Sequence, residues 1–123
     1  MGFRLHSHAK HEIKYSEHAV FNWSNNHINP IIECLADGDF WADSDYVGDA
    51  NNLEASRENL LKNVEKIITP DPDWEEQETL NELIEEMEND EECKISRQYL
   101  YEKLKALIEE ADPRNTYVFF SWF

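Results

Sequence analysis

The stretch from Asp71 to Glu92 restricts the fold of this chain more than any other part of it, because it contains twelve acidic residues and no lysine or arginine. A segment of this charge can be buried along one side only. Its apolar residues recur at spacings of three and four, which predicts a helix with one buried face and one acidic face. These apolar residues are Leu80, Leu83, Ile84 and Met87, with Trp74 near the start. Asp73 is expected to cap the helix, with Glu76 completing a capping box.

The negative charge is unevenly distributed along the chain. The 123 residues include 11 Lys and Arg against 27 Asp and Glu, for a net charge of −16. Residues 1–30 hold three basic and two acidic residues, so the remainder carries 8 − 25 = −17. All five histidines also lie in this near-neutral first part. The acidic remainder excludes nucleic acid and anionic membranes as direct partners of its surface, and it favours a basic partner.

Composition is consistent with one folded domain over residues 1–123, since 41% of the residues are hydrophobic and 12% aromatic. Cys34 and Cys93 are isolated from each other, which indicates neither a metal motif nor a disulfide framework. There is no apolar leader and no apolar run of the ~18 residues that a membrane span requires. We therefore expect a cytoplasmic protein without a membrane partner.

Strands are expected at both ends of the chain. Residues 2–8 alternate between apolar and polar side chains, and the closing run TYVFFSWF is rich in β-branched and aromatic residues. The two strands are expected to pair with each other. We expect both faces of the C-terminal strand to be covered, one through Val118, Phe120 and Trp122 and the other through Tyr117, Phe119 and Phe123.

Four helices are expected between these strands. The first starts either at Asn29-Pro30 or earlier, near Trp23, with Pro30 tolerated inside it, and it ends at Asp37-Gly38. Residues 37–52 are expected to form an acidic loop, and a second helix is expected over residues 53–68. The third is the acidic helix, and the fourth runs from a cap at Ser96 to Asp112-Pro113. The sequence therefore predicts an α+β fold, with about four helices on a small antiparallel sheet that includes both terminal strands.

Two features have the residue types of a metal site. His6 and His8 lie on one face of the N-terminal strand and His11 follows closely, so these three histidines are the candidate ligands of a transition metal. Residues 43–54 resemble the calcium loop of an EF-hand, with Asp43, Asp45, Gly48 and Glu54 at matching positions. Val47 supplies no side-chain oxygen where that loop needs one, so we predict no calcium site.

The remaining candidates concern binding to another protein. Glu82, Glu85, Glu86 and Glu88 on the acidic helix are the charged candidates, and Trp74, Phe40 and Trp41 are the apolar anchors. No motif of nucleophilic catalysis or phosphate binding is present. We therefore expect a small acidic binding protein without catalytic activity.

In size and charge the chain resembles bacterial immunity proteins, antitoxins and phage inhibitors that mimic nucleic acid. The resemblance implies a basic protein partner such as a nuclease. Two other hypotheses stay open, a metal-binding protein or metal-dependent enzyme that uses the histidines, and a domain whose acidity serves only solubility.

Overall fold

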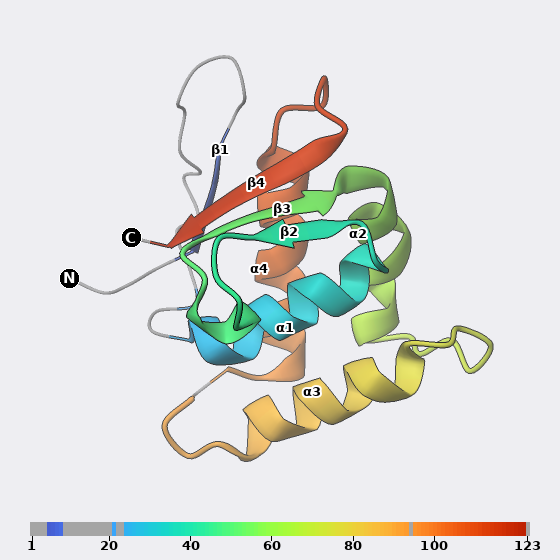
Figure 1. The fold of residues 1–123 in the computed structure, drawn as a ribbon. Helices are drawn as coiled ribbons and strands as arrows, with labels where there is room; N and C mark the ends of the chain where they lie inside the picture. The colour runs from blue at the N-terminus through green and yellow to red at the C-terminus, as the bar shows by residue number, and fades with distance from the viewer. Residues whose placement is uncertain (1–4, 9–20, 22–23, 94, 123) are drawn as a thin grey trace.

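The computed structural model of the chain describes residues 5–8, 21, 24–93 and 95–122. Within them the fold is α+β, with four α-helices and a four-stranded antiparallel sheet, as predicted (Figure 1). None of the helices in these ranges is both long and apolar enough to cross a membrane. The strands are β1 (Leu5–His8), β2 (Phe40–Ala42), β3 (Asn52–Ser56) and β4 (Tyr117–Trp122). The helices are α1 (Asn25–Ala36), α2 (Arg57–Asn63), α3 (Gln77–Asn89) and α4 (Arg97–Glu110), with short 3-10 turns η1 (Val47–Asp49) and η2 (Val64–Ile67).

The sheet has the strand order β1-β4-β3-β2, so the two terminal strands lie side by side. Leu5 is in register with Trp122, which confirms the predicted pairing of the chain ends. Along β4 the burial alternates, with Val118, Phe120 and Trp122 buried and Tyr117 exposed. The expectation that both faces of β4 are covered is confirmed for the face of Val118, Phe120 and Trp122, whereas on the other face Tyr117 is exposed, Phe119 is partly buried and Phe123 lies outside the described residues. The helices cover one face, and the other face remains accessible at Tyr117 and in part at Phe119.

Helix α1 starts at Asn25, four residues before the capping sequence, so the earlier of the two predicted starts is correct. Pro30 lies inside the helix and supplies no backbone donor there, but the buried face of Ile28, Ile31 and Leu35 holds the helix in place. The helix ends where predicted, because Asp37 adopts a left-handed conformation with φ of 52°.

The region from residue 37 to residue 68 differs from its prediction. The expected acidic loop contains strand β2 and turn η1, and the expected helix start at Leu53 is strand β3. Leu53 and Ala55 are buried in the sheet, in register with Phe120 and Val118 of β4. Helix α2 begins only at Arg57, where the Ser56 hydroxyl accepts a hydrogen bond from the backbone N–H of Asn59 at 3.2 Å.

The acidic helix also starts later than predicted. The capping box at Asp73 is wrong, because the backbone N–H of Asp73 donates to the Asp71 side chain at 3.0 Å and α3 begins at Gln77. The segment between η2 and α3 contains two nearby prolines, Pro70 and Pro72, which favour turns over helix. The predicted buried face of α3 is confirmed at Leu80, Ile84 and Met87. The cap of α4 is confirmed too, since the Ser96 hydroxyl accepts from the Tyr99 N–H at 3.1 Å.

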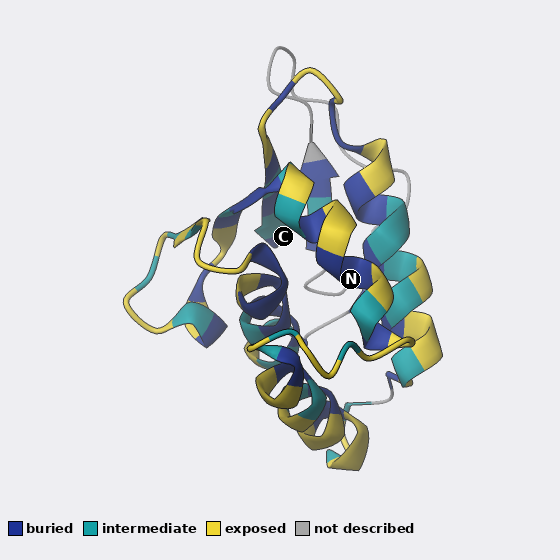
Figure 2. Cartoon of the chain, turned by 90° about the vertical axis from the view of Figure 1, so that its right-hand side faces the viewer, coloured by how far each residue is buried: buried dark blue, intermediate teal, exposed yellow. Residues whose placement is uncertain are grey.

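The helices form layers on the covered face of the sheet. Helices α1, α2 and α4 contact the strands, whereas α3 packs against α1 and η2, farther from the sheet (Figure 1). Figure 2 shows that the inward sides of the helices are buried and their outward sides exposed. This outer position leaves a whole side of α3 accessible, which places its acidic residues at the surface.

Candidate interaction surface

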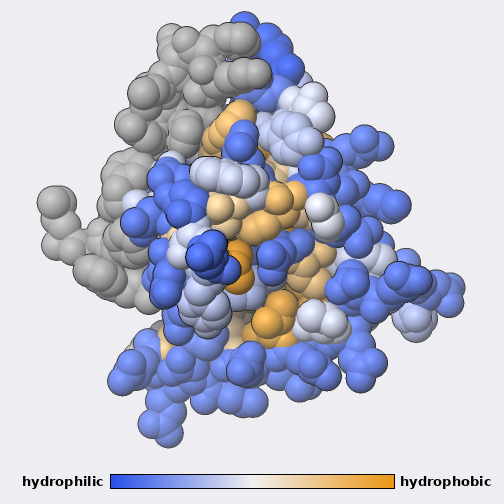
Figure 3. Space-filling model, viewed as in Figure 1, coloured by the Kyte–Doolittle hydropathy of each residue, from blue (hydrophilic) through white to orange (hydrophobic). Residues whose placement is uncertain are grey.

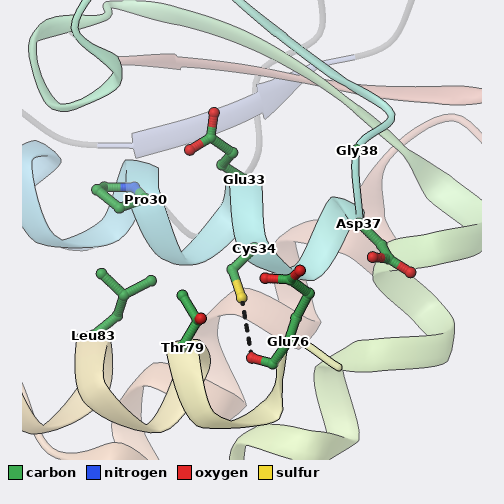
Figure 4. A pocket seen from close by; sticks show the side chains of 8 residues that line it. All are labelled: Pro30, Glu33, Cys34, Asp37, Gly38, Glu76, Thr79 and Leu83. Atoms are coloured by element: carbon green, nitrogen blue, oxygen red, sulfur yellow. Dashed lines mark hydrogen bonds between the residues drawn. The ribbon is translucent and has the colours of Figure 1, made fainter. Parts of the chain in front are cut away.

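Helices α1 and α3 lie antiparallel, and a side-chain hydrogen bond joins them near each end. At the start of α1, His27 Nε2 is 2.7 Å from Asp90 Oδ2, just after the end of α3. Near the end of α1, the Cys34 thiol donates to the backbone oxygen of Glu76, 3.7 Å away, at the start of α3 (Figure 4). The two contacts define a seam along which both helices present side chains to solvent.

Two hollows open along this seam. The first has a volume of about 510 Å³ and is lined by Pro30, Glu33, Cys34, Asp37, Gly38, Glu76, Thr79 and Leu83 (Figure 4). The second has a volume of about 670 Å³ and is lined by His27, Glu82, Glu85, Glu86, Asn89 and Asp90. No lysine or arginine among the described residues lines either hollow. The carboxylates that line them form what is called here the acidic seam: Glu33, Asp37, Glu76, Glu82, Glu85, Glu86 and Asp90.

Part of the lining of the first hollow carries no charge. Figure 4 shows Leu83 and Thr79 of α3 directed towards α1, with Cys34 opposite them and Pro30 on the same side as Cys34. In Figure 3 hydrophobic side chains reach the surface in the middle of this view, and hydrophilic side chains line the edge formed by α3. The seam therefore offers apolar contact area between two acidic rims.

Burial raises the pKa of the Cys34 thiol to about 12, with further contributions from the negative charges of Glu76, Asp37 and Glu33. The thiol therefore stays protonated at neutral pH, and only the thiolate is an effective nucleophile. The first hollow consequently provides a recessed polarisable surface rather than a reactive centre.

The carboxylates of the second hollow differ in whether another side chain of the protein contacts them. The hydrogen bond from His27 lowers the pKa of Asp90. Glu82, Glu85 and Glu86 are exposed, and none of them forms an ion pair with a described residue. Like charges at these helical spacings destabilise a helix by about 0.2–0.5 kcal/mol per pair. A cationic partner would relieve this repulsion.

The four predicted glutamates do not all share this surface. Glu82, Glu85 and Glu86 line the second hollow together. Glu88 points elsewhere, with its Oε1 atom 3.7 Å from Arg97 Nη2 of α4. The sequence did not indicate the contribution of α1, although Glu33 and Asp37 are four residues apart and both exposed, which is the spacing of one helix face.

The structure separates the three predicted aromatic anchors. Trp74 precedes α3 and is half-buried, with Lys66 Nζ 4.4 Å from its ring centroid. Phe40 is half-buried against the core from β2, and Trp41 is 52% exposed. Trp41 is in register with Glu54 of β3, on the sheet face that the helices leave open. Phe40 and Trp41 are therefore not brought beside the acids of α3.

The predicted histidine ligands are only partly described. His6 and His8 are paired on β1 with Ser121 and Phe119 of β4, and His11 lies outside the described residues. Among the residues that the structure describes, no three His, Cys, Asp or Glu side chains are arranged to hold a metal ion. A role of His6, His8 and His11 in binding a transition metal stays a prediction.

The segment that resembles an EF-hand loop joins two strands rather than two helices. The carboxylate at its first position is already hydrogen-bonded within the protein. Asp43 accepts hydrogen bonds from the Asn51 N–H at 2.9 Å and the Asn52 side-chain amide at 2.8 Å. Glu54, at the last position, lies in strand β3. This arrangement differs from the helix–loop–helix setting of an EF-hand.

Comparison with known proteins gives no relative, because no family model, curated protein or solved structure matches the chain.

Proposed function

We propose that this chain is a small binding protein without catalytic activity whose acidic seam engages a basic surface of another protein. One observation carries the proposal: carboxylates from two helices surround an apolar strip, and no lysine or arginine from the described part of the chain lines the seam. A partner surface with lysine or arginine around one apolar side chain would be complementary to it in charge and in polarity.

The concentration of charge favours fast association. A field of one sign on a binding face raises association rates by about 10–1000-fold, and salt screens this effect. Proteins that bind nucleic acid expose basic surfaces of the required kind. The proposed partner is therefore a nuclease or another nucleic-acid-binding protein, and the proposed role is inhibition of the kind that immunity proteins and antitoxins exert.

The test uses two variants with the same change in net charge. The seam variant replaces Glu82, Glu85 and Glu86 with glutamine, and the control variant replaces three exposed glutamates of α2 and α4 in the same way. The control residues are Glu58, Glu102 and Glu109. The partner is captured with the immobilised wild-type chain and identified as the protein that the control variant retains and the seam variant loses.

Association rates with this partner are then measured by stopped-flow at increasing salt. We expect the wild-type rate to fall steeply with salt, and the seam variant to bind at least about tenfold more slowly than the control variant at low salt. We expect the seam variant to melt no lower than wild type, because the substitutions remove like-charge repulsion. Equal rates for both variants, independent of salt, would mean that the acidity of α3 serves solubility only.

A further inference from the structure

Another hollow, with a different chemistry from the two along the acidic seam, lies on the open face of the sheet. It has a volume of about 240 Å³ and is lined by Asp39, Phe40, Trp41, Glu54 and Tyr117, and it is called here the aromatic hollow. Its residues come from β2, β3 and β4 and from the residue before β2. Since β2 is an edge strand, the hollow opens at the margin of the sheet. Trp41 and Tyr117 are 52% and 37% exposed, so their side chains are accessible to a ligand.

We propose that the aromatic hollow binds one arginine side chain of a partner protein. Aromatic rings attract cations through the negative potential of their faces, and arginine is the cation found most often on such faces. Its planar guanidinium also donates several hydrogen bonds in a fork that fits carboxylates. The hollow supplies both aromatic faces and carboxylates. Trp41 and Tyr117 offer rings for stacking, and Asp39 and Glu54 offer negative charge.

The hydrogen bonds around the hollow leave acceptors for such a ligand. The Tyr117 hydroxyl donates to Asp39 Oδ1 at 2.9 Å, which orients the ring and leaves Asp39 Oδ2 available. This hydrogen bond, followed by the negative charges of Asp39 and Glu54, raises the pKa of Tyr117. The phenol therefore stays neutral while both carboxylates keep the hollow negative.

Other aromatic side chains of this protein already have a cation of the chain itself nearby. Lys66 lies over Trp74, Lys103 over Tyr99 and Lys105 over Tyr101, at 4.4, 5.6 and 5.4 Å from the ring centroids. In the part of the chain that the structure describes, no cation lies over the rings that line the aromatic hollow. The carboxylates of the hollow likewise form no ion pair with a described residue. A partner's guanidinium would complete the same arrangement there.

This site is independent of the acidic seam, because it lies on the sheet face opposite the helices. Its test is a titration of the ¹⁵N-labelled chain with N-acetylarginine amide, followed by the indole N–H signal of Trp41. That signal is assigned among those of the four tryptophans by its absence in Trp41→Leu. N-acetylcitrulline amide, which has the same shape without the charge, is the matched neutral probe.

We expect a saturable shift of the Trp41 signal with the arginine probe and none with the citrulline probe. Glu54→Gln should weaken binding by about three- to tenfold, the factor expected for losing one charged contact of this strength. Glu109→Gln, which removes an exposed charge from α4, should leave it unchanged. The proposal is overturned if both probes shift Trp41 equally, if the arginine probe shifts only signals of α1 and α3, or if Glu54→Gln binds like Glu109→Gln.

Discussion

Replacing Asn29 with alanine should remove three hydrogen bonds from the interior of the molecule at once. Asn29 lies on α1 and is fully buried. Its side-chain amide donates to the backbone oxygens of Val47 at 2.9 Å and Ala50 at 3.0 Å, and its oxygen accepts from Trp122 Nε1 at 2.7 Å. One side chain thus joins the first helix, the turn between β2 and β3, and the C-terminal strand.

The expected cost follows from these contacts. A hydrogen bond inside a protein contributes about 1 kcal/mol net, so the loss of three predicts a decrease of about 3 kcal/mol in the free energy of unfolding. Trp122→Phe removes the bond to the indole together with part of a buried ring, and the part of its effect that disappears when Asn29 is already alanine is expected to be about 1 kcal/mol. Asn26 is exposed on the same helix, so Asn26→Ala is expected to change stability by less than about 0.5 kcal/mol.

Urea unfolding followed by circular dichroism measures these differences. With an m-value of about 1–3 kcal/mol/M, a loss of 3 kcal/mol lowers the midpoint by at least about 1 M. If Asn29→Ala and Asn26→Ala unfold at the same urea concentration, the buried network does not stabilise this fold and the reasoning fails.

Three further predictions concern other parts of the chain. Deleting residues 119–123 should prevent cooperative folding, because burial of each large side chain contributes roughly 1.5–3 kcal/mol; a truncated chain that melts cooperatively would contradict this. Calcium titration calorimetry should be flat in the micromolar range, since Asp43 is already used by Asn51 and Asn52; a saturable heat lost in Glu54→Gln would show a site. Alkylation at pH 8 should modify Cys34 far more slowly than a free thiol, because its pKa is raised to about 12 and the thiolate is almost absent at that pH; rapid labelling of Cys34 in the folded protein, detected by mass spectrometry, would contradict this.

Local sequence patterns were sufficient to predict those helices and strands whose residues favour the same structure without help from the rest of the chain. The buried face of α3 follows from the spacing of its few apolar residues among acids. The cap at Ser96 and the C-terminal strand follow from the residue types themselves. In each of these segments helix or strand preference agrees with the tertiary environment, so the sequence alone predicts the element.

Elsewhere the tertiary structure decided between local alternatives. Residues 53–56 precede a helix and fit its apolar stripe, yet they form a strand because β4 offers a partner on which Leu53 and Ala55 are buried. Pro30 is tolerated within α1 because contacts with the core outweigh one missing backbone hydrogen bond.

The candidate surfaces also depend partly on local sequence and partly on tertiary packing. The sequence determined that the region around α3 is acidic. That Glu33 and Asp37 of α1 join it, and that Trp41 instead lies beside Glu54 and Tyr117, was decided by the packing of α1 against α3 and by the register of the sheet. Such proximities depend on contacts between residues far apart in the chain, and the spacing of residues within one segment holds no information about them.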